Sequence, residues 1–184
     1  MARPRQFDET DVKAALRDVF WEHGYDGASY AQIMKATGLQ KGSLYASFGD
    51  KRALYQHALS DYDANHVSPG VKMLRDEGRD GADRISDLFD SIVSAAGTRR
   101  GRWGCLLCNA AVDQAPFDGD VEKTVTASMD RMRTAIAEAV ADTPAFDKAE
   151  LIWTAYFGGR VMVKAGYGTN VLEAQRQQVM ELFD

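Results

Sequence analysis

Long apolar runs and cysteines are both scarce in this chain of 184 residues. No apolar run approaches the roughly 18 residues that a membrane-spanning helix needs, and no apolar stretch follows the first charged residues. We therefore expect no membrane association and no signal peptide, and hence a cytoplasmic protein. The two cysteines, Cys105 and Cys108, are too few and too closely spaced for a disulfide framework.

Sequence motifs for catalysis and metal binding are also missing. The chain has no Gly-rich phosphate loop, no His-Glu-x-x-His pair and no Gly-x-Ser-x-Gly nucleophile elbow. A zinc site needs about four ligands, and the three histidines, His23, His57 and His66, are remote in sequence from the cysteines. We therefore predict that the protein is not an enzyme and that it uses no metal and no cofactor.

An excess of positive charge is absent as well. The chain has 22 Lys and Arg against 27 Asp and Glu, for a formal net charge of −5. Residues 1–65 alone contain eight Lys or Arg and nine Asp or Glu. This balance argues mildly against nucleic-acid binding, because DNA affinity depends on the neutralisation of phosphates. A DNA-binding interpretation must therefore place its cations on one face.

What the sequence does have is helical periodicity, with 45% apolar residues. Amphipathic segments alternate with short Gly, Pro or Asp breaks, and no convincing strand pair interrupts them. We predict an all-α fold of about nine helices, with three short helices in residues 1–53 and longer ones in residues 54–184. The segment Ser68-Pro69-Gly70 either starts a new helix, with Ser68 as its cap, or kinks one long helix.

Residues 29–54 contain the most informative pattern. Two short helices are separated by Thr37-Gly38-Leu39-Gln40, and Ser29 with Gln32 fits a capping box at the start of the first of them. A reversal within about four residues is typical of a helix-turn-helix. The expected inward-facing residues are Ile33, Leu39, Leu44 and Phe48. The expected outward-facing residues, suited to a DNA groove, are Lys41, Gly42, Ser43, Tyr45 and Ala46.

The spacing Gly38-Leu39-x-Lys41-Gly42-Ser43-Leu44-Tyr45-x-x-Phe48-x-x-Lys51-x-x-Leu54 resembles the signature of the tetracycline-repressor (TetR) family of transcriptional regulators. The resemblance covers about residues 8–60. It implies an N-terminal DNA-binding domain and a larger effector-binding and dimerisation domain. It also implies a homodimer that represses from a palindromic operator on double-stranded DNA until a small-molecule effector or thiol modification releases it. Gln40 departs from the Ser or Thr cap of many relatives, so the third helix is expected to start differently.

The same resemblance assigns roles to individual residues. It implies that the third helix enters the major groove and that Tyr45 and Lys51 contact phosphates, with Lys51 at a helix N-terminus that also favours an anion. Arg52 is a weaker phosphate candidate. The complete predicted DNA-binding set is Arg3 and Arg5, as an N-terminal arm, with Ser29, Lys41, Gly42, Ser43, Tyr45, Ala46 and Lys51.

The last two predicted helices, about residues 147–165 and 171–183, supply the dimer surface. In the family that the chain resembles, these helices pair with their copies as a four-helix bundle. The predicted interface residues are Leu151, Ala155, Gly158, Gly159, Met162 and Val179. Arg160 stands where an apolar residue is expected, so it either pairs with an acidic residue across the interface or faces solvent.

The middle helices are expected to enclose the effector pocket. Its candidate lining residues are Phe89, Trp103, Cys105, Cys108, Met129, Met132, Trp153, Tyr156 and Phe157. Aromatic and Met residues at helical spacing are more often core than pocket residues, so simple packing remains an alternative for each of them.

The run Gly104-Cys105-Leu106-Leu107 resembles a subgroup of these repressors, some of which sense electrophiles or oxidants through such a cysteine. Three upstream arginines, Arg99, Arg100 and Arg102, and a nearby helix N-terminus would lower the pKa of Cys105. Cys108, one turn later, would then serve as a resolving thiol. Packing of both cysteines is the other interpretation. For the whole chain, the alternative function is a helical protein-interaction module without DNA binding, which would suit the acidic net charge.

Overall fold

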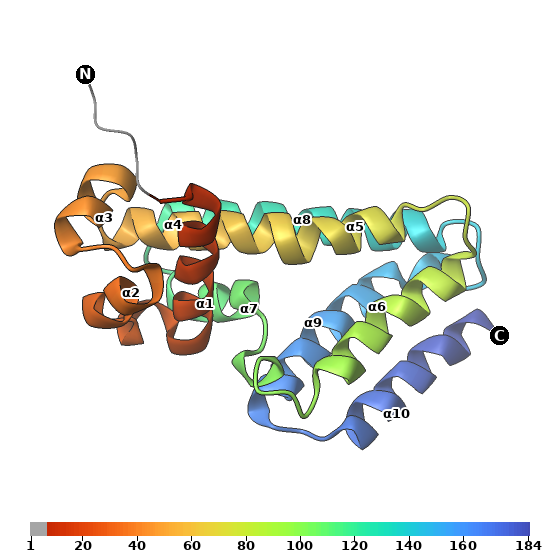
Figure 1. The fold of residues 1–184 in the computed structure, drawn as a ribbon. Helices are drawn as coiled ribbons and strands as arrows, with labels where there is room; N and C mark the ends of the chain where they lie inside the picture. Colours follow the sequence, from red (N-terminus) through yellow and green to blue (C-terminus); the bar gives the residue numbers. More distant parts are fainter. Residues whose placement is uncertain (1–6) are drawn as a thin grey trace.

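The computed structural model describes residues 7–184, and this part of the chain folds into helices without a strand (Figure 1). Three helices form one end of the molecule: α1 (Glu9–Gly27), α2 (Tyr30–Thr37) and α3 (Lys41–Phe48); α2 and α3 are short, as predicted, whereas α1 has 19 residues. The other helices are α4 (Lys51–Tyr62), α5 (Ser68–Leu74), α6 (Gly81–Ala95), α7 (Leu106–Asp113), α8 (Gly119–Val140), α9 (Ala149–Ala165) and α10 (Thr169–Met180). None of the helices in this range is long and apolar enough to cross a membrane. The predicted all-α class is confirmed.

The first helix attaches the N-terminal unit to the rest of the protein. Asp8 caps α1, because its carboxylate accepts a hydrogen bond from the Thr10 amide at 2.7 Å. The buried face of α1 packs on α4, where the rings of Phe20 and Tyr55 meet edge to face at 5.1 Å. These three helices are therefore anchored on α4, which leads away from them towards the rest of the protein.

Helices α4 and α5 form one continuous helix over residues 51–74, so the described residues contain nine separate helices, as predicted (Figure 1). Residues 63–67 form a π-helical turn in which the Ser68 amide donates to the carbonyl of Asp63. Pro69 has no amide hydrogen to offer, and the shifted hydrogen bonding of the π turn accommodates that loss. Ser68 has helical backbone angles and does not act as a cap. The structure thus supports the second sequence interpretation, an irregularity within one long helix.

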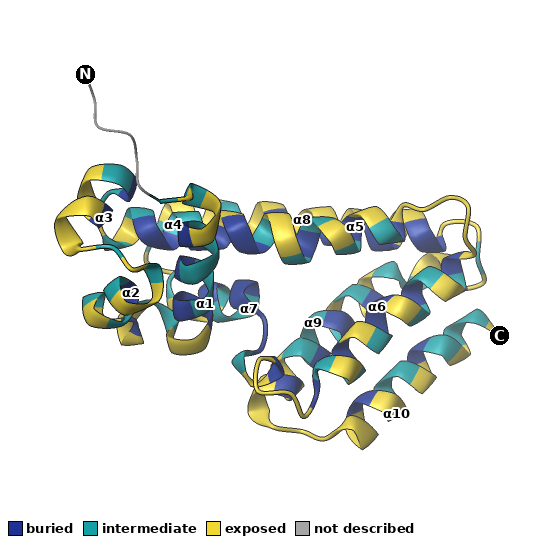
Figure 2. Cartoon of the chain, viewed as in Figure 1, coloured by how far each residue is buried: buried dark blue, intermediate teal, exposed yellow. Residues whose placement is uncertain are grey.

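The larger domain consists of two groups of helices. Helix α8 runs beside α4 and α5, while α6, α9 and α10 form a second group, and α7 lies near α1 (Figure 1). Buried residues line the facing sides of these helices and exposed residues cover their outer sides (Figure 2). The core therefore continues from the N-terminal unit along α4 into the second group of helices.

Two of the predicted dimer-interface residues lie inside the protomer instead. Val179 is only 5% exposed. Gly159 is buried where α9 meets α6 and α10, and a Cβ atom there would lie 2.6 Å from Oε1 of Gln175 and 3.2 Å from Cδ1 of Ile92. The glycine therefore allows close packing within one chain, which a sequence pattern cannot distinguish from close packing between two chains.

Candidate DNA-binding surface and thiol site

The turn between α2 and α3 is fixed by local hydrogen bonds. Gly38 ends α2 in the left-handed conformation, with φ of 69°, and its amide donates to the carbonyl of Met34 at 2.9 Å. Ser29 and Gln32 form the predicted capping box at the start of α2. Leu44 of α3 is fully buried. These interactions hold α3 against its neighbours and leave its opposite side free.

The free side of α3 is the surface that the sequence predicted. Lys41, Gly42, Ser43, Tyr45 and Ala46 are all exposed, and the outer side of α3 is yellow in Figure 2. Gln40 precedes the helix and its side chain makes no capping hydrogen bond, in agreement with the expected departure at this position. The start of α3 therefore has no side-chain cap, which leaves its first amide groups free to bind a phosphate oxygen.

A pair of tyrosines joins α2 to this surface. The hydroxyl groups of Tyr30 and Tyr45 lie 2.7 Å apart, and their rings stack with centroids separated by 5.7 Å. The Lys41 Nζ atom lies 4.6 Å from the centroid of the Tyr30 ring. Burial and the hydrogen bond with Tyr45 raise the pKa of Tyr30 to about 12, so its hydroxyl keeps its proton at neutral pH. Sequence reasoning missed Tyr30, because helical spacing alone does not show that its ring reaches α3.

The two cations at the start of α4 behave differently. Asp50 caps α4 through the Ala53 amide, and Lys51 places Nζ 4.9 Å from the centroid of the Tyr25 ring. Arg52 instead binds the carboxylates of Asp118 and Asp120, with Nη2 at 2.7 and 2.6 Å from their oxygens. These hydrogen bonds raise the pKa of Arg52 and the first of them lowers the pKa of Asp118. Lys51 thus remains available to a phosphate, whereas Arg52 already has partners. Arg3 and Arg5 lie outside the described residues.

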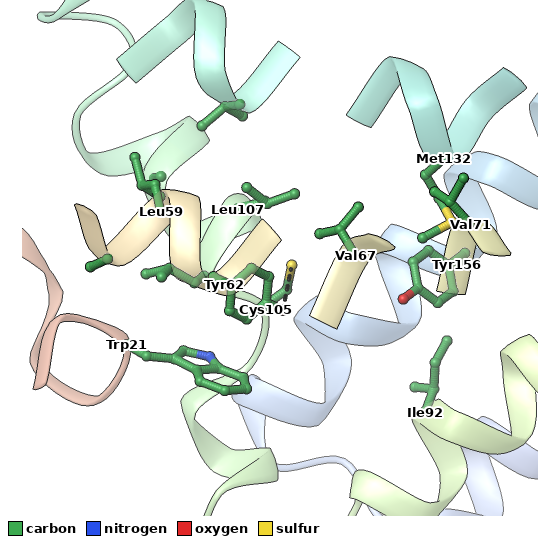
Figure 3. Close-up of a cluster of buried hydrophobic side chains, with 14 of the residues drawn as sticks. Trp21, Leu59, Tyr62, Val67, Val71, Ile92, Cys105, Leu107, Met132 and Tyr156 are labelled. Atoms are coloured by element: carbon green, nitrogen blue, oxygen red, sulfur yellow. Dashed lines mark hydrogen bonds between the residues drawn. The ribbon is translucent and has the colours of Figure 1, made fainter. Parts of the chain in front are cut away.

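Cys105 precedes α7 and lies among groups from several helices. Its Sγ atom accepts a hydrogen bond from the Tyr62 hydroxyl at 3.4 Å, and that hydroxyl receives one from Nη2 of Arg160 at 3.3 Å. Trp21, Tyr62 and Cys105 come from α1, α4 and the start of α7, and they lie together in Figure 3. The Trp21 indole donates to the carbonyl of Gly104 at 3.1 Å. Both cysteines are free thiols.

The environment of Cys105 favours a thiolate. A hydrogen bond from the Cys108 thiol lowers the pKa of Cys105 to about 5, and the charge of Arg160 and the Tyr62 hydroxyl add to this effect against the opposing effect of burial. The same thiol–thiol hydrogen bond and burial raise the pKa of Cys108. These opposite shifts favour the thiolate at Cys105 over Cys108.

The predicted source of this effect was partly wrong. Two of the upstream arginines bind other acids, Arg99 with Glu22 and Arg100 with Asp18. The expected helix N-terminus does contribute, through the backbone amide of Cys108. Arg160, for which the sequence left two other roles open, instead turns inward to Tyr62.

The predicted aromatic pocket is almost filled. The cavity that Cys105, Met132, Tyr156 and Phe157 share with Tyr62 and Arg160 has a volume of only about 10 Å³, roughly that of one water molecule. Phe89 packs against Tyr156. Trp103 packs against Trp21, and Trp153 packs against Phe157. Met129 is half-buried against the core. None of these four lines that cavity.

Larger open spaces lie nearer the surface. One pocket of about 430 Å³ lies between α1, α7 and α9, and it contains Cys105, Cys108, Arg160 and Lys164 in its wall. Lys164 donates from Nζ to Oδ1 of Asn109 at 2.6 Å in the same wall. Cys105 is thus reached from a pocket with several charged residues in its wall rather than from the filled aromatic cavity.

The outer side of α9 is apolar. Leu151 is 53% exposed, Val161 45% and Met162 37%, and a Cβ atom added at Gly158 would meet nothing within 4 Å. Ala155 is half-buried against the core. On α10, Val171 adds a further exposed apolar side chain. Of the predicted interface residues, Leu151, Gly158 and Met162 therefore face outward.

A helix-turn-helix unit continuous with a larger all-helical part is typical of one class of DNA-binding transcription regulators, and comparisons with known proteins identify the family. Residues 13–58 match the family model described as bacterial regulatory proteins, tetR family. The chain belongs to the TetR family of transcriptional regulators.

Curated relatives match over part of their length. The repressor ComR of Escherichia coli is 28% identical over 123 residues, which are 67% of this chain and 59% of ComR. The regulator YezE of Bacillus subtilis is also 28% identical over 123 residues, which are 63% of its length. The chain thus spans about three fifths of the length of these curated relatives.

Solved structures match over nearly the whole chain. A cysteine variant of the TetR-family regulator CifR, in complex with 26-base-pair operator DNA, has a TM-score of 0.81 at 27% identity, covering 99% of this chain and 100% of that one. The reduced form of NemR from E. coli has a TM-score of 0.79 at 16% identity, covering 95% and 96%, and this likeness concerns the fold alone.

Proposed function

We propose that this protein is a transcriptional repressor that binds a palindromic operator as a homodimer in the cytoplasm. The observation that carries the proposal is the exposed side of α3, where Lys41, Ser43 and Tyr45 are held outward by the buried Leu44 and the capped turn before it. The operator complex of CifR supports the assignment, and the relatives are regulators rather than enzymes.

In this proposal the residues of the surface have separate tasks. Tyr45 and Lys51 bind phosphates, which positions the helix on the duplex. Lys41, Ser43 and Ala46 approach the base edges, and Gly42 lets the backbone come close to the DNA. Ser29 acts indirectly, because its side chain is used in the capping box that orients α2. Arg3 and Arg5 extend the contact as an N-terminal arm.

Selection of random duplexes by the purified full-length protein tests this function. We expect enrichment of an inverted repeat whose half-sites lie about 34–36 Å apart or a multiple of that spacing. Lys41→Glu, which places a negative charge on the groove-facing side, is expected to abolish the enrichment. Failure of the wild-type protein to enrich any inverted repeat at low salt would contradict the proposal and favour a protein-interaction module.

Dimerisation is proposed to use the outer sides of α9 and α10. Leu151, Gly158 and Met162 are spaced along one side of α9, and Val171 adds to the apolar surface from α10. One helix-turn-helix reads only a few base pairs, so two copies are needed for a specific site. An exposed apolar strip of this kind is typical of a protein interface.

We expect Met162→Glu to convert the dimer into a monomer. A carboxylate buried without a partner costs several kcal/mol, and every 1.4 kcal/mol raises the dissociation constant about tenfold. Analytical ultracentrifugation over a range of concentrations measures the change. Phe117→Glu is the matched control, because Phe117 is 86% exposed and lies between α7 and α8. Unchanged dimerisation of a Leu151→Glu, Met162→Glu double variant would exclude this surface.

For the trigger, we propose that modification of Cys105 releases the operator. The thiolate and its open pocket favour reaction over inert packing. Hydrogen bonds join α7 to α1 near both ends of α7. Just before α7, the Gly104 carbonyl accepts from the Trp21 indole, and at its end Asp113 accepts from the Tyr25 amide at 3.4 Å. A group added at Cys105 would displace α7 from α1. Release follows if the modified protein prefers a conformation that does not fit the operator.

A further inference from the structure

A second open space touches Arg160, separate from the cysteine pocket. This groove of about 280 Å³ lies between α1, α6, α9 and the loop before α7. Among residues 7–184, Arg160 alone lines both the groove and the pocket of about 430 Å³. The groove is slightly smaller than the usual ligand pocket of roughly 300–1,000 Å³, so it suits a small molecule.

The charges around the groove are not balanced. Arg17 binds Asp18 and Asp61, each at 2.8 Å, and Arg100 also binds Asp18. Arg160 forms an ion pair with no carboxylate of residues 7–184, and its Nε atom is buried without a hydrogen-bond partner among them. A buried cation without an anion costs several kcal/mol. The thiolate of Cys105 compensates it only in part, because the Tyr62 hydroxyl bridges the two groups.

Polar groups and flat rings line the same groove. The Arg100 guanidinium lies 5.5 Å from the centroid of the Trp21 ring, and the ring of His66 lies 4.9 Å from it. Burial and the charges of nearby arginines lower the pKa of His66 to about 4, so it presents a neutral ring. The Thr98 hydroxyl already donates to the carbonyl of Ala95. The exposed Ser94 is a further hydroxyl-bearing residue of the wall.

We propose that this groove binds a small carboxylate, with its oxygens held by Arg160, Arg100 and Ser94 and its body against the wall that Trp21 and His66 help to form. A guanidinium binds a carboxylate through two parallel hydrogen bonds, and the ligand supplies the acceptor that Arg160 lacks. The site goes beyond the proposed repressor function, since binding requires neither DNA nor reaction at Cys105.

Occupation of the groove has a consequence for the thiol. A carboxylate beside Arg160 offsets the positive charge that stabilises the Cys105 thiolate, so the pKa of Cys105 rises. The thiol then reacts more slowly with an electrophile. The carboxylate therefore protects Cys105 without occupying its pocket.

Titration of the full-length protein with benzoate tests the site, and benzamide is the neutral control. Tryptophan fluorescence follows Trp21, and calorimetry gives the stoichiometry. We expect one benzoate per chain with a dissociation constant of about 1 mM or below, and no saturation with benzamide. Arg100→Gln and Ser94→Ala are expected to weaken binding about tenfold. Arg99→Gln, on the same loop but 87% exposed and outside the groove, should not change it.

A second measurement follows the alkylation of Cys105 by iodoacetamide, in which the thiolate sulfur displaces iodide and forms a carbon–sulfur bond. Saturating benzoate is expected to slow this reaction several-fold, and benzamide to leave it unchanged. Cys105→Ser should still bind benzoate, which separates the groove from the thiol site.

Four outcomes would overturn the proposal. They are the absence of saturable benzoate binding up to about 10 mM, equal binding of benzamide, equal binding of inorganic phosphate, and unchanged benzoate affinity in both Arg100→Gln and Ser94→Ala. Since these measurements contain no DNA, their failure is distinct from failure of the repressor function.

Discussion

Alanine in place of Lys51 is expected to lower operator affinity about 10- to 100-fold, whatever the base sequence. A charge-assisted hydrogen bond contributes about 1.5–3 kcal/mol, and Lys51 is placed at the start of α4 to give one to a phosphate. Loss of one phosphate contact also makes the slope of log affinity against log salt about 0.9 less steep. Fluorescence anisotropy of a labelled operator, measured at several salt concentrations, gives both quantities.

Two further variants sharpen this experiment. Tyr45→Ala should weaken binding to a similar extent but change the salt slope less, because a phenol releases no counterion. Lys72→Ala, at an exposed position of α5, removes a positive charge far from α3 and is expected to leave affinity and slope nearly unchanged. An unaltered salt slope for Lys51→Ala would exclude its phosphate contact.

Serine in place of Cys105 is expected to abolish release of the operator by electrophiles or oxidants, and the wild-type reaction should have an unusual pH profile. Because the pKa of Cys105 is lowered to about 5, the thiolate forms as pH rises through that value and is lost as pH falls below it. The alkylation rate should therefore level off near pH 6, whereas an ordinary cysteine titrates near pH 8.5. Mass spectrometry of the peptide containing Cys105 measures the rate.

The neighbours of Cys105 provide the internal comparison. Cys108→Ala removes the thiol whose hydrogen bond is the largest cause of the lowered pKa, so the inflection should move to higher pH while alkylation itself persists. Arg160→Gln should move it in the same direction by removing the positive charge. A wild-type inflection near pH 8.5, or full release of the operator by an electrophile in Cys105→Ser, would show that Cys105 is a packing residue and not a sensor.

The N-terminal unit could be predicted from sequence because its determinants are local. The capping box of Ser29 and Gln32, the left-handed Gly38 and the alternation of buried and exposed residues in α3 all operate within a few residues. The spacing of residues 38–54 therefore indicated both the fold of this unit and its outward surface.

The thiol site could be predicted only in part, because its partners are distant in sequence. Cys105 could be identified from its neighbours in the chain. Its hydrogen-bond donor Tyr62, however, lies 43 residues before it, and Arg160, which donates to Tyr62, lies 98 residues after Tyr62. The acidic partners of Arg52 could not be predicted either, since they are 66 and 68 residues away. Periodicity shows that a residue faces inward but does not show which charge it will meet there.

The π turn in the long helix of residues 51–74 determines how the N-terminal unit is rotated about the axis of that helix. One residue of an α-helix corresponds to about 100° of rotation, so a local change of register turns everything before it relative to everything after it. Pro69 keeps that register from reverting to a regular α-helix, because its ring would collide with the carbonyl of Asn65. The orientation of α3 relative to the dimer axis thus depends on Pro69, which lies about 27 Å along the long helix from Lys51.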